Sequence, residues 1–559
     1  MSWRYRFSLF VFLFLFLLVV LRLFYWQVVR ASELNALGQA QYGSTVSLSA
    51  QRGVIKTSDG FAIAGNKISY LLFANPKEIG DEKNLVGKLS EILGTKQASI
   101  SSKLLPERFW VPIQTQVDEK AKEKIELLKF PGVGFEEQTT RFYPEASMAA
   151  KLLGFVGKDD NGEDKGYFGL EGYYDRQLRG KSGQAIVIHD ASGRPILSKL
   201  SDSTGKVDGR DLTLHVDRSI QFMLDSTLKD GIEQYGAASG MAAVMDPKTG
   251  GILAMSSFPT FDPRSYQDFG NDLYRNPFIS DTYEPGSTFK PLIIASALDA
   301  SLIKPDTKCP ICAGPVLIGG YEIHTWNDEY NENESMTDVI VHSDNTGMVY
   351  VGEKLGLDRM VSYIDKFGIG NLTGVDLQGE VSPFARQKEN WYPIDVATAS
   401  FGQGITVTPI ELLSAFSAIA NNGKRMEPHV VSKITTSDGQ TIDIPPKVLS
   451  QPISERAAKI TTEMMVNAVD NGEAKFARLK GYRIAGKTGT AQIPLAGHYD
   501  PTKTIASFIG FAPADDPKFL MLVVINRPTS SIYGAETAAP IFFKAARNIL
   551  TYYGIPPSN

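Results

Sequence analysis

The hydrophobic pattern of the chain begins with one long apolar stretch. Phe7–Val29 is interrupted only by Ser8, Arg22 and Gln27. As a helix rising about 1.5 Å per residue, it is long enough to cross a hydrocarbon layer of about 30 Å. The basic residues Arg4 and Arg6 precede it, which by the positive-inside rule keeps the N-terminus in the cytoplasm. A cleaved signal peptide would need a small-residue cleavage site after the apolar stretch, and none follows it. We therefore expect an uncleaved single-pass anchor.

Residues 31–208 alternate short periodic segments with turns. Ser69–Ala74 and Val111–Gln116 have the alternation of strands, whereas Asp118–Leu128 and Glu145–Gly154 have the spacing of helices. No Ser/Lys or His/Asp constellation stands out here. We therefore interpret this region as a mixed α/β structural domain that stands nearest the membrane.

From residue 209 to residue 559 the pattern becomes denser. Helical segments lie between strands near both ends of this region: strands Leu212–Leu214, Ala242–Met245, Gly251–Ser256, Ser507–Phe511 and Phe519–Ile525, and helices Ser219–Tyr235, Thr346–Lys354, Ile410–Asn421 and Glu536–Tyr552. The arrangement predicts one sheet flanked by helices. We expect three parts: a cytoplasmic stub and anchor (1–30), a non-catalytic domain (31–208) and a sheet-and-helix domain (209–559).

Composition supports a globular protein outside the membrane segment. The chain has 559 residues, of which 43% are hydrophobic and 21% charged, so two or more domains are expected. The net charge is −5, and no dense basic cluster is present. Nucleic acid is therefore not an expected partner.

The only two cysteines, Cys309 and Cys312, form the short segment Cys-Pro-Ile-Cys. In an oxidising compartment a short-loop disulfide is the plainest interpretation. Free buried thiols are a second one. A metal site that adds His324 and His342 is a third, although its spacing matches no familiar zinc finger. We expect no metal and no cofactor.

One short segment, Glu284–Pro291, joins a Pro-Gly turn to an apolar run. It contains Ser287 and Lys290 as Ser-x-x-Lys, so Ser287 is expected at or near a helix N-terminus with Lys290 on the same face. A Ser hydroxyl is a poor nucleophile until a neighbouring group takes its proton. An amine buried among apolar side chains loses proton affinity and can be that group. The structural alternative is a helix cap and a solvated lysine.

Two further motifs lie downstream. Ser343-Asp344-Asn345 offers a hydroxyl that can relay a proton and a carboxamide that can both donate to and accept from a peptide bond. Lys487-Thr488-Gly489-Thr490 offers a cation and two hydroxyls suited to a carboxylate, and Gly489 leaves room for a substrate backbone. Turns and helix caps are the structural alternatives for both.

The three motifs in this order resemble the signature of penicillin-binding proteins and serine β-lactamases. The resemblance extends to the N-terminal part and covers essentially the whole chain, through Arg52-Gly53, Arg141-Phe142-Tyr143-Pro144, Leu153–Gly157 and Gly169–Asp175. The family that this chain resembles is the class B penicillin-binding proteins, which are monofunctional peptidoglycan transpeptidases. Lys56-Thr57 stands where that family often has Asp-Arg. The resemblance implies an α/β (α+β) transpeptidase domain with a mixed sheet flanked by helices, an N-terminal transmembrane helix and a pedestal or dimerisation domain.

The resemblance also implies a role for each motif residue. Lys290 would deprotonate Ser287 as Ser287 attacks the penultimate carbonyl of a D-Ala-D-Ala stem peptide, and Ser343 would pass a proton toward the departing D-Ala. Asn345 would be a further catalytic residue. Lys487, Thr488, Gly489 and Thr490 would hold the terminal carboxylate and the substrate backbone. An amine of a second stem peptide would then resolve the acyl-enzyme and form a cross-link.

Partners and branch follow from the same resemblance. Expected ligands are peptidoglycan stem peptides on lipid-linked glycan strands and, covalently, β-lactam antibiotics. Expected protein partners are a polytopic membrane glycosyltransferase and other cell-wall synthesis proteins. Glu284–Lys290 and Phe401–Ile405 look more like the division or sporulation branch than the elongation branch. The alternatives are an elongation-type enzyme, a D,D-carboxypeptidase or β-lactamase that uses water, and a non-enzymatic division scaffold.

Overall fold

The protein is described here from a computed structural model, which covers residues 2–34, 37, 43–188, 201–383, 386–495 and 498–558. The chain divides into two compact units. One comprises Met1–Gln51 with Arg179–Gly209, and the other Arg52–Leu178 with Arg210–Asn559. The domain boundaries expected after residues 30 and 208 remain a prediction.

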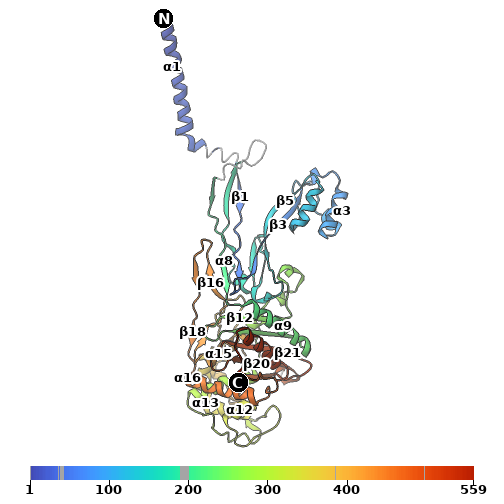
Figure 1. Ribbon diagram of the computed structural model, residues 1–559, viewed down its shortest axis with the longest axis vertical. Coiled ribbons are helices and arrows are strands. Elements are labelled where there is room, and N and C mark those ends of the chain that lie inside the picture. The colour runs from blue at the N-terminus through green and yellow to red at the C-terminus, as the bar shows by residue number, and fades with distance from the viewer. Residues whose placement is uncertain are drawn as a thin grey trace. The chain divides into compact units, whose positions relative to one another are not determined.

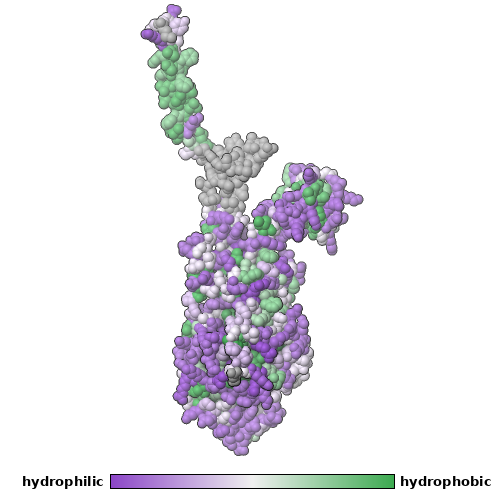
Figure 2. Space-filling view, in the orientation of Figure 1, coloured by the Kyte–Doolittle hydropathy of each residue, from purple (hydrophilic) through white to green (hydrophobic). Residues whose placement is uncertain are grey.

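The first unit contains the apolar N-terminal helix. α1 (Trp3–Phe24) continues into the π-helical turn η1 (Tyr25–Val29), which together make 27 residues of a length and composition that can cross a membrane. Figure 2 shows the surface of this helix as a nearly continuous apolar band. Near its end the Arg22 guanidinium lies 5.0 Å from the Trp26 ring centroid. An exposed apolar helix of this length supports the expected single-pass anchor.

The same unit contains an antiparallel three-stranded sheet in the order β1-β8-β9 (Figure 1). Its strands are β1 (Gly43–Leu48), β8 (Gly183–Ile188) and β9 (Ser201–Thr204). β8 and β9 follow β1 in the sequence by more than a hundred residues, so this sheet joins two distant segments of the chain.

The second unit begins with a seven-stranded mixed sheet in the order β17-β16-β10-β2-β3-β4, with β5 also paired to β3. Its strands are β2 (Ile55–Lys56), β3 (Ala62–Ala74), β4 (Val111–Val117), β5 (Val133–Phe142), β10 (Asp211–Leu214), β16 (Val431–Thr435) and β17 (Thr441–Asp443). The helices α3 (Glu82–Leu93), α4 (Gln97–Ser101) and α5 (Glu119–Leu127) bury a small core against β3 and β4. Lys56 forms an ion pair with Asp211 at 2.9 Å, and through it β2 contacts β10.

A buried ionic cluster, which we call the Glu171 cluster (Arg52, Arg141, Glu171 and Asp175), lies between these strands and α7 (Gly169–Tyr173). Glu171 is fully buried and accepts hydrogen bonds from Arg52 at 2.7 Å and from Arg141 at 2.6 Å. Arg52 also contacts Asp175 at 2.8 Å. The cluster therefore connects residues from three separate stretches of the N-terminal half.

The central element of the second unit is an antiparallel five-stranded sheet in the order β12-β11-β21-β20-β19 (Figure 1). Its strands are β11 (Ser239–Met245), β12 (Ile252–Phe258), β19 (Ala485–Leu495), β20 (His498–Ala512) and β21 (Phe519–Asn526). Along β21 alternate side chains enter two different cores: Leu522 faces one and Val523 the other. Because both faces are covered, β21 is apolar almost throughout rather than alternating with polar residues.

Helices cover both faces of this sheet. α9 (Arg218–Tyr235) and α17 (Ala538–Tyr552) bury one face, while α11 (Lys290–Asp299), α13 (Asn345–Lys366), α15 (Pro409–Ala420) and α16 (Glu455–Asn471) bury the other. Shorter elements complete the unit: α6 (Ala150–Leu153), α8 (Asp175–Arg179), α10 (Pro277–Ser280), α12 (Met336–Val341), α14 (Pro393–Ser400), β6 (Phe155–Lys158), β7 (Asp164–Tyr167), β13 (Val316–Ile318), β14 (Tyr321–Ile323), β15 (Arg425–Met426) and β18 (Val448–Ser450). The predicted fold class is confirmed, with the mixed pairing located in the seven-stranded sheet.

One predicted element is largely wrong. Of the helix expected over Glu145–Gly154, only α6 (Ala150–Leu153) is helical. Ala146 and Ala149 have φ values of +52° and +55°, which no right-handed helix contains. Helical spacing was present in the sequence, but the chain turns twice here so that Leu152 and Leu153 enter the main core.

Candidate active site

The segment around Ser287 is a tight turn that leads into a buried helix. Gly286 has φ +55° and donates its N–H to the Gly402 carbonyl at 3.0 Å, which fixes the turn. A 3-10 turn, η5 (Gly286–Phe289), then carries the half-buried Ser287 into α11. Because α11 is apolar and nearly all its residues are buried, it also buries its first residue, Lys290, completely. The predicted helix start is confirmed, with Ser287 one turn ahead of the α-helix proper.

Lys290 is hydrogen-bonded only to uncharged oxygens among the described residues. Its Nζ donates to the Ser343 carbonyl and to Asn345 Oδ1 at 2.9 Å, and lies 3.4 Å from Ser343 Oγ. Burial lowers the pKa of Lys290 to about 7, and the charge of Lys487 acts in the same direction, against the opposing effect of Asp344 and Glu473. Near neutral pH a large fraction of this amine is therefore uncharged and able to accept a proton.

Ser343 and Asn345 are positioned by the start of α13. Asp344 caps that helix by accepting the Gly347 N–H at 3.1 Å. Ser343 has φ +58°, a conformation that a non-glycine residue rarely adopts. Asn345 Nδ2 donates to the His324 carbonyl at 2.9 Å, which orients its Oδ1 towards Lys290. The strained backbone therefore belongs to Ser343, the residue whose hydroxyl faces the buried amine of Lys290.

The Lys-Thr-Gly motif lies on β19, at the edge of the five-stranded sheet. Lys487 is buried, which lowers its pKa despite the opposing charge of Glu473, and its Nζ donates to Thr488 Oγ1 at 3.0 Å. A Cβ on Gly489 would lie 2.7 Å from Thr288 Cγ2 and 2.4 Å from Ser507 Oγ. The absence of a side chain at Gly489 therefore lets β19 pack directly against η5. Thr490 Oγ1 accepts the Gly534 N–H at 3.0 Å.

The three motifs meet at one cavity of about 430 Å³, which we call the catalytic cleft. The predicted site residues that line it are Ser287, Ser343, Asn345, Thr488 and Thr490. Lys290 and Lys487 lie buried beside this lining, in contact with Ser343 and Thr488 respectively. The remaining predicted residue, Gly489, forms part of the packing between β19 and η5.

Several cleft residues carry no motif and were missed in the sequence. Glu473 follows the end of α16 and accepts a hydrogen bond from Thr488 Oγ1 at 3.0 Å. Trp326 and Tyr533 come from distant loops and also line the cleft, with ring centroids 5.6 Å apart. Their positions depend on long-range packing, so no local pattern could have indicated them. Glu284, inside the Ser287 segment, accepts the Gly404 N–H at 3.2 Å and interacts with Tyr499.

The cysteines form a disulfide bond between Cys309 and Cys312, and both residues are buried. Because both thiols are consumed in this bond, the free-thiol alternative and the metal site with His324 and His342 are wrong. Cys309 also donates its N–H to the Glu334 carbonyl at 2.8 Å, so the disulfide loop packs near the segment that leads into α12.

The helix-covered antiparallel sheet, with a cleft formed by η5, the start of α13 and β19, defines the class of the protein as a transpeptidase fold. The family model described as the penicillin binding protein transpeptidase domain matches residues 240–547, and that of the penicillin-binding protein dimerisation domain matches residues 47–214. The chain therefore belongs to the penicillin-binding protein transpeptidase family, in its class B form, and is an enzyme.

Individual relatives agree along the whole chain. The stage V sporulation protein D of Bacillus subtilis is 35% identical over 550 residues, which covers 96% of this chain and 83% of the relative. The peptidoglycan D,D-transpeptidase FtsI of Escherichia coli K12 is 30% identical over 570 residues, which covers 100% of this chain and 93% of the relative. The crystal structure of penicillin binding protein 3 from Mycobacterium tuberculosis, complexed with aztreonam, has a TM-score of 0.71 and 25% identity, covering 92% of this chain and 98% of that one.

Proposed function

We propose that this enzyme cross-links peptidoglycan stem peptides by D,D-transpeptidation through an acyl-enzyme on Ser287. The observation that carries the proposal is the buried Lys290, whose pKa of about 7 makes it a base in contact with Ser343, a residue that lines the same cleft as Ser287. Enzymes tune lysine in this way when they need a general base near neutral pH. Relatives named as peptidoglycan D,D-transpeptidases support the substrate class.

Each motif residue has a role in this reaction. Lys290 takes the Ser287 proton as Ser287 Oγ attacks the penultimate carbonyl of a D-Ala-D-Ala terminus, and Ser343 passes a proton to the departing D-Ala nitrogen. Asn345 holds the Lys290 amine at 2.9 Å and faces the substrate amide. The Lys487 charge, with the hydroxyls of Thr488 and Thr490, holds the terminal carboxylate.

Gly489 gives β19 the close packing against η5 that this arrangement needs. Backbone N–H groups of Ser287 and Thr490 stabilise the oxyanion, a contribution of about 3 kcal/mol per donor. A β-lactam acylates Ser287 by the same route, as the aztreonam complex of the related structure suggests.

Location and partners complete the proposal. The N-terminus lies in the cytoplasm because Arg4 and Arg6 precede the anchor, and the catalytic unit lies on the outer side of the cytoplasmic membrane. There it acts in septal or sporulation-linked wall synthesis with a polytopic glycosyltransferase, a branch supported by the similarity to a stage V sporulation protein. Digestion of intact spheroplasts by an external protease should remove the catalytic unit, and protection of that unit would contradict this orientation.

Labelling of the full-length protein with a fluorescent penicillin tests the chemistry. We expect stable labelling of the wild type, complete loss in Ser287→Ala and full labelling in the matched control Ser530→Ala, an exposed serine outside the cleft. Label that persists in Ser287→Ala would mean that the nucleophile is another residue. An unlabelled wild type would favour a scaffold, and loss of label within minutes would favour a hydrolase that uses water.

A further inference from the structure

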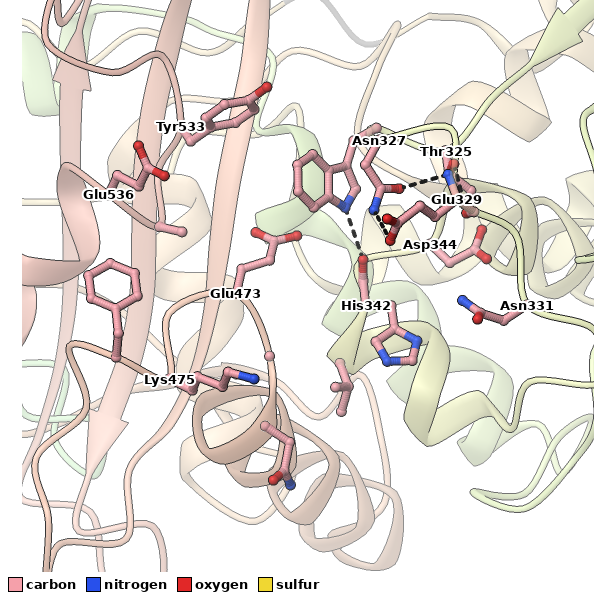
Figure 3. Close-up of a pocket in the computed structure, with 16 residues that line it drawn as sticks. Thr325, Asn327, Glu329, Asn331, His342, Asp344, Glu473, Lys475, Tyr533 and Glu536 are labelled. Carbon is pink, nitrogen blue, oxygen red and sulfur yellow. Dashed lines mark hydrogen bonds between the residues drawn. The ribbon is translucent and has the colours of Figure 1, made fainter.

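Glu473 provides the only carboxylate that the described residues place on the lining of the catalytic cleft. It also lines a neighbouring cavity of about 630 Å³, shown in Figure 3, where its side chain extends into the open space and away from Lys475. This negative charge lies beside Thr488, in the motif that is proposed to hold a substrate carboxylate. Two like charges would therefore meet in one part of the cleft.

The loop after α16 fixes the position of Glu473. A Cβ on the preceding residue, Gly472, would lie 2.4 Å from the Ala468 carbonyl oxygen and 2.8 Å from the Val341 carbonyl oxygen. Because Gly472 has no side chain, the chain can turn closely against the ends of both α16 and α12. The turn brings Glu473 to β19, where its Oε2 accepts a hydrogen bond from Thr488 Oγ1 at 3.0 Å.

The hydroxyl proton of Thr488 is already used in this arrangement. A threonine hydroxyl has one proton, a lysine amine with a proton to share donates, and an ionised carboxylate only accepts. Lys487 Nζ donates to Thr488 Oγ1 at 3.0 Å, so the Thr488 proton goes to Glu473. Thr490 Oγ1 instead accepts the Gly534 N–H and donates to no other described group. Only Thr490 therefore has a hydroxyl proton free for a ligand.

The charge of Glu473 is also not compensated by direct contact. Among the described residues no lysine or arginine lies within ion-pair distance of it. Burial lowers the pKa of both Lys290 and Lys487, and the charge of Glu473 opposes that effect at each of them. A carboxylate that approaches Lys487 therefore meets one cation and one nearby anion.

We propose that Glu473 determines how strongly the carboxylate site (Lys487, Thr488 and Thr490) selects ligands that carry a carboxylate. Glu473 competes with the ligand for the Thr488 proton and for the Lys487 charge, so the site binds carboxylates more weakly than its cation and hydroxyls alone would. Glu473 acts through Thr488 and Lys487 and is a specificity-determining residue. The inference rests on the proposed function, which assigns the ligand carboxylate to this site.

The competition has a consequence after acylation. The departing group of a D-Ala-D-Ala terminus carries the carboxylate, so repulsion by Glu473 favours its exit. Once that group has left, the Thr488 proton returns to Glu473 and the site is again in the state described here.

The test compares two acyl donors that differ in one charge, with the full-length protein. Both are thioesters of N-benzoyl-D-alanine: one with mercaptoacetic acid, whose carboxylate is free, and one with the methyl ester of that acid, which is neutral. Both form the same acyl-enzyme and depend on Lys290 in the same way. The ratio of their kcat/KM values for acylation at one pH therefore isolates the contribution of the carboxylate.

Two variants of Glu473 separate its charge from its hydrogen bond. Glu473→Gln keeps an oxygen that can accept from Thr488 and removes the charge, so it should raise the ratio of acid to ester about 3- to 20-fold. Glu473→Asp keeps the charge and should stay within about threefold of the wild type. Glu353→Gln, which removes an exposed charge on α13 outside both cavities, is the matched control and should not change the ratio.

The pH profile of the neutral ester gives a second readout that a merely structural role would not change. The charges that act on Lys290 are those of Lys487, Asp344 and Glu473. Glu473→Gln removes one that favours the protonated amine, so the midpoint of acylation should move to lower pH. The rate with the neutral ester above the midpoint should match that of the wild type, which also shows that the variant is folded.

Each other outcome contradicts a specific statement. An unchanged ratio, a lower ratio or an equal change with both donors in Glu473→Gln would overturn the role of Glu473 while leaving the acyl-enzyme intact. A wild type that does not prefer the acid would overturn the carboxylate site, and one that forms no acyl-enzyme from either thioester or from a penicillin would overturn the proposed function.

Discussion

Two groups of buried charge in the second unit have opposite surroundings. In the Glu171 cluster every buried ion has a partner of opposite charge: Glu171 lies between Arg52 and Arg141, and Arg52 also contacts Asp175. In the catalytic cleft the buried Lys290 is hydrogen-bonded to the neutral Ser343 and Asn345. The first arrangement uses charge to join segments, and the second leaves an amine ready to lose its proton.

The pKa values show the physical difference. Burial alone would raise the pKa of Glu171, but Arg141 and Arg52 together outweigh it and lower that pKa, so the carboxylate stays ionised. For Lys290, burial and the charge of Lys487 both lower the pKa, and the charges of Asp344 and Glu473 oppose them only in part. Complete compensation therefore keeps a buried charge, whereas incomplete compensation changes the protonation state.

The largest expected effect is on catalysis. Lys290→Met keeps a similar shape and removes the base, so acylation by a fluorescent penicillin should fall about 100- to 10,000-fold. Folding stability should not fall, because the variant no longer buries an amine. Between about pH 7 and 10 the unfolded chain binds a proton that folded Lys290 has lost, so Lys290 makes stability rise with pH there. Urea unfolding of Lys290→Met at several pH values should no longer show this rise of stability with pH, which would confirm that Lys290 is the group with the lowered pKa. Acylation within twofold of the wild type would contradict it.

The opposite pattern is expected in the Glu171 cluster. Glu171→Gln leaves Arg52 and Arg141 buried without their shared carboxylate, which should cost about 3–5 kcal/mol of unfolding free energy. Equilibrium urea unfolding measures this, and the acylation rate of the remaining folded protein should match that of the wild type. A loss of less than about 1 kcal/mol would mean that water or Asp175 replaces the missing charge.

A smaller effect is expected on the pH dependence of acylation. In the proposed mechanism the uncharged form of Lys290 is the reactive one, so the rate should rise with pH through a midpoint of about 7. Lys487→Met removes a charge that lowers the pKa of Lys290, so the midpoint should move to higher pH. Lys518→Met, an exposed lysine outside the cleft, should leave the midpoint where it is. A midpoint that moves to lower pH in Lys487→Met would assign the titration to another group.

The smallest effect is expected where water already compensates the charges. Glu455 and Lys459 form an exposed i,i+4 ion pair on α16. Glu455→Gln should change neither the thermal midpoint nor the acylation rate beyond the error of measurement, because exposed pairs contribute little. A clear loss of stability in Glu455→Gln would show that an exposed ion pair can contribute as much as a buried one, so exposure alone would not separate the two.

The sequence by itself determined the features that depend on neighbouring residues. The apolar span gave the anchor helix, the periodicity gave most strands and helices, and the motifs around Ser287, Ser343 and Lys487 gave the family and the candidate residues. Each of these signals lies within a few residues of chain, where helix, strand and turn preferences act. The fold class followed because strands near both ends of the catalytic region enclose helices.

Only the tertiary structure decided which charges are compensated and what surrounds the motifs. The approach of β19 to η5 at Gly489, the disulfide bond between Cys309 and Cys312 and the two turns that replace most of the helix at Glu145–Gly154 all depend on packing between distant segments. Glu473, Trp326 and Tyr533 enter the cleft for the same reason. A pKa depends on the surroundings in three dimensions, and a sequence supplies residue types without those distances.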